Sequence, residues 1–386
     1  FIIKVNIKKL DIKNIAYSLI LFFTSIIFLI FIIEIFLRFV PIKGVEMGTY
    51  VYDNNINLYK HNPNSKFIKT NIRDEIIVRT VNSQGFLDIN HKKEKSKDFY
   101  RIGFFGDSYV ESIQVPLEKT FFRIIDNALE YKKIEIFGFG KSGLGTLHSY
   151  MTSDYYSEYY DLDMVVYVFV ENDLGDQIEL IKKSSTFPYL EIKEGELHIN
   201  DKAINSRLNN KSIKSKILSS FIYRESIFLQ TVIRRIKMLM DYGIKIKLNE
   251  NDLTLSSIGD LKKIPNQNDL PSTWNTKYKN EALDIGERII KKWYNKCKLQ
   301  NKKFVLLYVP RASQYKKNIE VQDSWKFWLY NLCNDLKIDF IDPTGHFLKI
   351  DSSEGKIYDD HFSELGHNIF ARSFLDWFGS KNIIEF

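Results

Sequence analysis

The chain has 386 residues, of which 44% are hydrophobic and 27% are charged, so it can bury a sizeable core in one large domain with an insertion. Its net charge of +7 comes from lysines scattered among acidic residues, which is unlike the basic stripe of a nucleic-acid-binding protein. The only two cysteines, Cys297 and Cys333, form no CxxC pair, which excludes the usual metal-cluster and redox motifs and favours two buried thiols over a disulfide.

The first 40 residues predict a membrane anchor. Residues 15–33 contain no charged side chain, and roughly 20 such residues span a bilayer as a helix. Lys4, Lys8, Lys9 and Lys13 precede this run, which favours an amino terminus inside the cell and an exported remainder. No small-residue cleavage site follows, as a signal peptide would require. The alternative is a very apolar helix buried inside the protein.

Residues 41–99 are polar and irregular, with one short strand-like run at 76–78. We interpret this region as a linker that becomes an amino-terminal flap on the main domain. Within it, the sequence NSQGF at 82–86 predicts a turn followed by an aromatic anchor.

From residue 100 onward, short apolar runs alternate with longer amphipathic segments. The runs predict strands and the segments predict helices. Alternation of apolar strands with helices is typical of a parallel sheet that is covered on both faces. The strands are expected at 102–105, 134–137, 164–170, 304–309 and 340–341. The helices are expected at 120–131, 146–160, 280–299, 321–336 and 363–378.

Residues 178–279 interrupt the alternation and predict a largely helical insertion. Within 212–242, apolar residues recur at helical spacing, and the other face is basic. We expect the apolar face to pack on the core as a lid; the alternative is a helix on the membrane surface near the anchor. The basic residues are Lys214, Arg224, Arg234, Arg235 and Lys237. The chain thus divides into 1–40, 41–99, 100–177, 178–279 and 280–386.

The loop after the first predicted strand carries a candidate nucleophile. The apolar run ends in Gly106-Asp107-Ser108, which predicts a sharp turn. Ser108 would then lie at the carboxyl end of a strand, where open α/β sheets keep their ligand sites. A serine hydroxyl is a poor nucleophile unless a base takes its proton.

Two further loops could stabilise the oxyanion that forms when a serine attacks a carbonyl. Residues 138–145, with the sequence GFGKSGLG, include Gly143, and glycine lets the backbone approach a ligand closely. Asn172 follows the third strand, and its amide could donate to an oxyanion. Each feature alone has a structural explanation, a flexible turn for the first and a helix cap for the second.

The last loop offers the base. His361 comes just before the final helix, and a carboxylate close to it in the chain could fix the tautomer of the imidazole. Asp359 is the favoured carboxylate, and Asp360 is its rival. His367 falls within the final helix, and we expect it to be structural.

These four blocks, in this order at the ends of alternating strands, resemble the SGNH (GDSL-like) hydrolase superfamily, and most closely its bacterial members with one membrane anchor. The resemblance runs from about residue 82 to the final helix. It implies an α/β fold with a flavodoxin-like, five-stranded parallel sheet. Many relatives have the aspartate three residues before the histidine, where this chain has Tyr358.

The resemblance also implies roles for the residues of the four blocks. Ser108 would be the nucleophile, His361 the base and Asp359 the residue that orients the base. The oxyanion would be held by the backbone N–H groups of Ser108 and Gly143 and by the side chain of Asn172. No metal or organic cofactor would be needed.

By the same resemblance, the protein would be a membrane-anchored, exported esterase that removes acyl groups, such as O-acetyl, from surface glycans. The substrate would be an acylated carbohydrate or another ester, and the membrane is the only other partner indicated. One alternative is a polysaccharide O-acetyltransferase, in which a sugar hydroxyl instead of water takes the acyl group. The other is a non-catalytic glycan-binding or assembly protein that keeps the fold.

Overall fold

The architecture comes from a computed structural model that describes most of the chain. Lys4, Lys8 and Lys9, which favour the expected membrane orientation, lie outside the described residues, as does much of the insertion. The described residues are 12–40, 42–179, 187–194, 196–209, 212–242, 276–310, 324–350, 353 and 355–381.

Five parallel strands form the central sheet, in the order β11-β10-β7-β5-β6. The first of these five strands along the chain, β5, lies between the second, β6, and the third, β7, so the chain changes direction across the sheet between β5 and β7. This is the flavodoxin-like order, and ligands bind such sheets at that switch point. The predicted fold class is confirmed. The strands are β5 (Tyr100–Gly106), β6 (Ile134–Gly140), β7 (Met164–Phe169), β10 (Lys303–Tyr308) and β11 (Asp339–Ile341).

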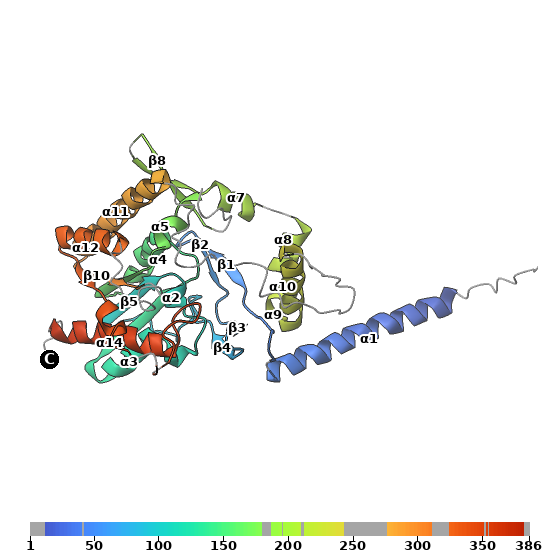
Figure 1. The fold of residues 1–386 in the computed structure, drawn as a ribbon. Coiled ribbons are helices and arrows are strands. Elements are labelled where there is room, and N and C mark those ends of the chain that lie inside the picture. The colour runs from blue at the N-terminus through green and yellow to red at the C-terminus, as the bar shows by residue number, and fades with distance from the viewer. Residues whose placement is uncertain are drawn as a thin grey trace, which may run out of the picture.

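Helices cover both faces of this sheet because successive strand side chains point to opposite faces. Phe104 packs with α3 and α14 on one face, whereas its neighbour Phe105 packs with α4, α11 and α12 on the other (Figure 1). Both phenylalanines are fully buried, as are Cys297 and Cys333, which are free thiols as predicted. The helices are α3 (Phe121–Leu129), α4 (Thr146–Tyr159), α11 (Thr276–Leu299), α12 (Ser324–Leu336) and α14 (Glu364–Ser380).

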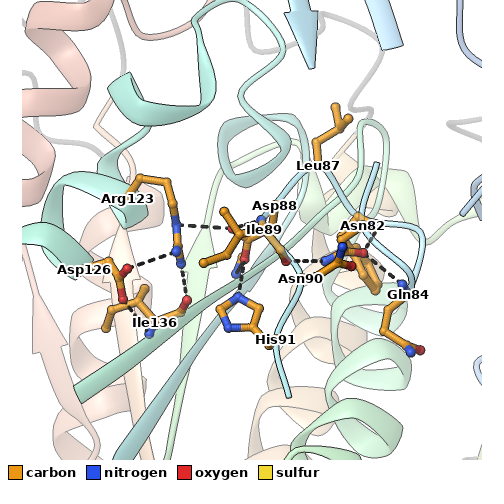
Figure 2. Close-up of polar contacts among 12 residues, drawn as sticks. Asn82, Gln84, Leu87, Asp88, Ile89, Asn90, His91, Arg123, Asp126 and Ile136 are labelled. Carbon is orange, nitrogen blue, oxygen red and sulfur yellow. Dashed lines mark hydrogen bonds and ion pairs between the residues drawn. The ribbon is translucent and has the colours of Figure 1, made fainter. Parts of the chain in front are cut away.

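The flap is part of the folded domain, and a buried polar network ties it to the sheet (Figure 2). The Asp88 carboxylate accepts a hydrogen bond of 2.9 Å from the Gly138 backbone on β6, and it lies 3.2 Å from Arg123 Nε and 3.1 Å from His91 Nε2. Burial alone would raise the pKa of Asp88, but the Arg123 charge and the His91 hydrogen bond outweigh it and lower the pKa. A buried charge with this many partners fixes the flap in place.

The turn predicted at 82–86 is present. The Asn82 side-chain oxygen accepts hydrogen bonds from the backbone N–H groups of Gln84 and Phe86, at 3.0 and 2.9 Å. This local bonding closes the turn, and Phe86 is buried in the core as the expected aromatic anchor.

The flap strands pair as two antiparallel hairpins, β1 (Tyr50–Asp53) with β2 (Leu58–His61) and β3 (Lys66–Thr70) with β4 (Ile76–Thr80).

The described part of the insertion is largely helical, as expected, but it also contains an antiparallel hairpin. The residues at helical spacing over 212–242 form three helices. Ser220 and Ser226 each accept a hydrogen bond from the backbone N–H three residues later, so each begins a new helix. The elements are β8 (Tyr189–Lys193), β9 (Glu196–Asn200), α7 (Lys202–Leu208), α8 (Ile213–Ser219), α9 (Phe221–Glu225) and α10 (Ile227–Tyr242).

The amino-terminal helix α1 (Ile12–Phe39) projects from the domain (Figure 1). Its segment Lys13–Phe39 is long and apolar enough to cross a membrane, and none of its most apolar part is buried in the protein. The other short helices among the described residues are α2 (Ser108–Glu111), α5 (Asp173–Asp176) and α13 (Thr344–Phe347), with 3-10 turns at Leu117–Lys119 and Glu130–Lys132.

Candidate active site

Ser108 begins α2 immediately after β5. A side chain on Gly106 would place its Cβ 2.8 Å from Val110 and 2.9 Å from a backbone oxygen of β7, so only glycine allows this turn. The Asp107 carboxylate caps α2 by accepting a hydrogen bond of 2.9 Å from the Tyr109 N–H. Ser108 is thereby held at the carboxyl edge of the sheet, next to the switch point.

His361 lies against Ser108, although 253 positions separate them in the chain. The distance between His361 Nε2 and Ser108 Oγ is 2.7 Å, shorter than the 3.1 Å from the same oxygen to Asp107 Oδ2. The Tyr109 ring packs against the imidazole with 4.9 Å between ring centres. The serine hydroxyl can therefore donate directly to the imidazole nitrogen, which is the geometry that proton transfer requires.

The carboxylate that faces the imidazole is Asp360. Asp360 Oδ2 lies 3.5 Å from His361 Nδ1, and this neighbouring imidazole lowers the pKa of Asp360 despite its partial burial. Asp359, which the sequence favoured, points elsewhere: its Oδ2 pairs with Arg73 Nε at 2.7 Å. Arg73 lies in the turn of the β3–β4 hairpin, and its guanidinium draws Asp359 towards the flap.

Asn172 lies beside the nucleophile. Its amide nitrogen donates to Asp107 Oδ2 at 3.2 Å and to Asp176 Oδ2 at 3.1 Å. The Asp107 oxygen is the same one that the Ser108 hydroxyl contacts, so the amide and the hydroxyl share one neighbour. The two carboxylates fix the orientation of the amide. To donate to an oxyanion, the amide would give up its hydrogen bond to one of these two carboxylates.

Gly143 occupies the turn that follows β6. Its φ of +80° is the left-handed conformation that glycine adopts without strain, and the Leu144 N–H closes the turn on the Lys141 carbonyl at 3.2 Å. Gly140, at the end of β6, has no room for a side chain because a Cβ there would collide with the backbone of α2. The turn therefore packs directly against the helix that begins with Ser108.

A buried carboxylate behind Ser108 links three parts of the chain, and sequence reasoning did not find it. Glu111 Oε1 lies 2.5 Å from His61 Nε2 on β2, and Glu111 Oε2 accepts hydrogen bonds from the Ser142 N–H at 2.8 Å and from the Ser142 hydroxyl. We call this set of His61, Glu111 and Ser142 the Glu111 brace. It joins the flap, the nucleophile helix and the turn that contains Gly143.

The ionisation of the Glu111 brace follows from its burial. Burial would raise the pKa of Glu111, but the hydrogen bonds from His61 and Ser142 outweigh it and lower the pKa to about 2. Burial lowers the pKa of His61, so the imidazole is neutral at pH 7. Because a carboxylate only accepts hydrogen bonds, His61 carries its proton on Nε2.

The sequence matches no known protein-family model and no curated protein. Solved structures with a similar arrangement include an acetyl xylan esterase, AlAXEase, at 14% identity and a TM-score of 0.38; the match covers 72% of this chain and 98% of the esterase. A lipolytic G-D-S-L family protein from Veillonella parvula matches at 11% identity, TM-score 0.37, with 72% and 98% coverage. A catalytic mutant of Axe2, an acetylxylan esterase from Geobacillus stearothermophilus, matches at 12% identity, TM-score 0.37, with 74% and 95% coverage.

Proposed function

We propose that this protein is a serine esterase that cleaves acyl esters through an acyl-enzyme on Ser108. The observation that carries the proposal is the distance of 2.7 Å between Ser108 Oγ and His361 Nε2, at the switch point of the sheet. A nucleophile and a base within hydrogen-bond reach, with a third group near the base, are the arrangement that activates a serine.

In the first half of the reaction, His361 Nε2 takes the proton as Ser108 Oγ attacks the ester carbonyl. Asp360 faces Nδ1 of the resulting imidazolium and stabilises its positive charge. The imidazolium then returns the proton to the leaving alcohol as the carbon–oxygen bond of the ester breaks. In the second half, His361 deprotonates a water, which attacks the acyl-enzyme and releases the acid and free Ser108.

Three groups would stabilise the tetrahedral oxyanion: the backbone N–H groups of Ser108 and Gly143 and the amide of Asn172. The contact of Asn172 with Asp107 supports its assignment because it places the amide beside the nucleophile. The hydrogen bond from the Ser142 N–H to Glu111 holds the Gly143 turn against α2, which supports the second donor. Losing one such donor typically costs about 2.7 to 4 kcal/mol of transition-state stabilisation.

We further propose that the substrates are O-acetyl or other acyl esters of surface glycans on the outer side of the membrane. The support is the resemblance of the four sequence blocks to the anchored branch of the SGNH hydrolases, together with the apolar helix α1. A tether that holds the domain near the membrane would give it access to polymers at the cell surface.

Hydrolysis of p-nitrophenyl acetate by the full chain, compared with Ser108→Ala, tests the proposal. We expect the substitution to lower kcat/KM at least about 1,000-fold, and a fluorophosphonate probe to label Ser108 in the unmodified protein only. Equal rates for the two proteins would contradict the proposal and favour a non-catalytic glycan-binding or assembly protein.

A second experiment distinguishes hydrolysis, in which water takes the acyl group, from transfer, in which a sugar hydroxyl takes it. An oligosaccharide acceptor is added to the reaction, and the products are weighed by mass spectrometry. We expect free acetate and an unmodified acceptor, whereas an acetylated acceptor would reassign the protein as an O-acetyltransferase.

A further inference from the structure

The end of α1 nearest the domain would lie at the surface of the bilayer, so a segment bound to this end is held at a fixed distance from the bilayer core. Residues 14–33 carry no charge, and 20 residues of helix extend roughly 30 Å, the thickness of a bilayer core. Glu34 and Arg38 are the first charged residues after this run. When α1 spans a membrane, these two side chains therefore lie where the hydrocarbon core meets the headgroups.

The insertion is bound to α1 at that level. The Glu34 carboxylate accepts hydrogen bonds at the start of α10: from Oγ of Ser226, the residue between α9 and α10, at 2.9 Å, and from the backbone N–H groups of Ile227 and Phe228 at 3.2 and 3.1 Å. Arg38 donates a hydrogen bond of 2.6 Å to the carbonyl of Glu225, the last residue of α9. Glu34 thus caps the amino-terminal end of α10, and Arg38 caps the carboxyl-terminal end of α9. We call these contacts the joint between α1 and the insertion.

Apolar packing adds to this joint. Leu37 of α1 and Ile227 of α10 are both buried in one small cluster with Val45 and Met47 of the flap. The junction of α9 and α10 is thus held against α1 by both polar and apolar contacts, and its position along α1 is fixed.

Large apolar side chains next to this joint face away from the protein. Phe221 and Ile222 of α9 are each 70% exposed, and Phe221 is only one helical turn, roughly 6 Å, from Glu225. Ile213 and Ile217 of α8 are exposed as well. Figure 1 shows α8, α9 and α10 on the side of the domain towards which α1 extends.

Basic side chains accompany these apolar ones. Lys216 on α8 and Arg235 and Lys237 on α10 are all exposed. Exposed apolar residues beside exposed lysines and arginines are the composition of a helix that lies on a membrane, where the apolar groups enter the interface and the cations meet anionic headgroups.

We propose that α8, α9 and the exposed part of α10 around Arg235 and Lys237 form a membrane-contacting surface, with Phe221 and Ile222 inserted at the bilayer interface. The joint with α1 sets the depth of this surface, and the two contacts together give the domain one orientation on the membrane. A single spanning helix would leave the domain free to tilt on the membrane. A second contact holds the carboxyl edge of the sheet at a constant distance from the membrane surface.

Site-directed spin labelling of the full chain in nanodiscs of phosphatidylcholine and phosphatidylglycerol tests this proposal. Nitroxides are placed by Phe221→Cys and Ile222→Cys, with Phe28→Cys in α1 as the membrane reference and Tyr131→Cys as the aqueous reference. Tyr131 is 78% exposed and follows α3, on the other side of the domain. The chain without an added cysteine is the blank, because Cys297 and Cys333 are buried.

We expect the labels at 221 and 222 to collide with a water-soluble nickel chelate about fivefold less often than the label at 131, and to collide more often with oxygen, which concentrates in lipid. Chelate accessibility equal to that at 131, with position 28 shielded, would overturn the proposal and retain the anchor. Chelate accessibility at position 28 would overturn both. Neither result depends on the proposed esterase activity.

Discussion

The two sides of the candidate active site are held very differently. On the nucleophile side, Asp107 and Glu111 are buried, and the Glu111 brace fixes α2 to the flap and to the turn after β6. On the base side, the side chains of His361 and Asp360 are 26% and 36% exposed, and 3.5 Å separates Nδ1 from the nearer carboxylate oxygen.

This difference indicates a division of work. Donors that stabilise an oxyanion act only if they are already in place when charge develops, so the nucleophile side gains from rigidity. A base moves a proton in each half of the reaction and gains from some freedom. We therefore expect substitutions on the nucleophile side to affect both stability and rate, and substitutions of the partly exposed His361 and Asp360 to affect rate alone.

The largest effect is expected from His361→Ala. The substitution removes the group that takes the Ser108 proton, so kcat should fall about 10,000-fold, while the melting temperature stays the same because the side chain is partly exposed. Initial rates with p-nitrophenyl acetate and thermal unfolding measure both quantities. A variant with more than a tenth of the original rate would refute the assignment of the base.

Glu111→Gln tests the rigid side. A glutamine keeps the shape but turns one acceptor into an NH₂ donor, which must then face either His61 or Ser142. One buried donor loses its partner, so we expect a loss of about 2 to 3 kcal/mol in the free energy of unfolding, with about a tenfold lower kcat as the Gly143 turn shifts. Urea unfolding and steady-state rates provide the measurements.

The matched control is Glu118→Gln, the same change at an exposed glutamate seven positions later. It should alter neither stability nor rate measurably. Equal behaviour of the two variants would mean that the Glu111 brace has no role in holding the site.

Each side also contains one buried histidine, which makes stability depend on pH. Burial lowers the pKa of His367, behind the base, to about 3, and it also lowers the pKa of His61. In the unfolded chain these histidines take up a proton near pH 6.5, whereas in the folded chain they stay neutral to a lower pH. The free energy of unfolding is therefore highest above pH 6.5 and falls as the pH drops towards 3. For His367 alone, the loss at pH 5 is about 2 kcal/mol.

Urea unfolding at several pH values measures this loss. His367→Asn keeps an acceptor for the Phe121 N–H and should remove much of the loss on acidification, so its curve approaches that of the unmodified protein at pH 5. His346→Asn, the same change at a more exposed histidine, is the matched control. A parallel pH dependence for His367→Asn would contradict the assignment of a neutral, buried imidazole.

The five strands could be predicted because they follow from local signals: apolar runs, the residues that end them, and alternation with amphipathic helices. The flavodoxin-like order of the strands has no local signal, and its prediction rests on the resemblance of the four sequence blocks to the SGNH hydrolases. The proximity of Ser108, Asn172 and His361 could be predicted for a related reason. Parallel strands place their carboxyl ends at one edge, so loops distant in the chain are neighbours without any knowledge of side-chain packing.

The features that sequence reasoning missed depend on contacts with no local signal. His61 and Glu111 are 50 positions apart and belong to no motif, and only the fold brings the flap over α2. Ser220 and Ser226 resemble ordinary helix residues until their side chains are seen to cap the helices that follow. The choice between Asp359 and Asp360 depends on Arg73, from a hairpin at the other end of the chain.

That choice gives the last and smallest prediction. Asp360→Asn removes the charge that faces His361 Nδ1, and because the contact is long and partly exposed, we expect only about a tenfold loss in kcat, with no change in stability. Asp359→Asn weakens a pair with a partly exposed arginine and should change kcat by no more than about twofold. Rates for the two variants at several pH values decide the matter. The reverse ranking would return the orienting role to Asp359 and would mean that the base side rearranges during catalysis, so that the imidazole meets a different carboxylate from the one beside it at rest.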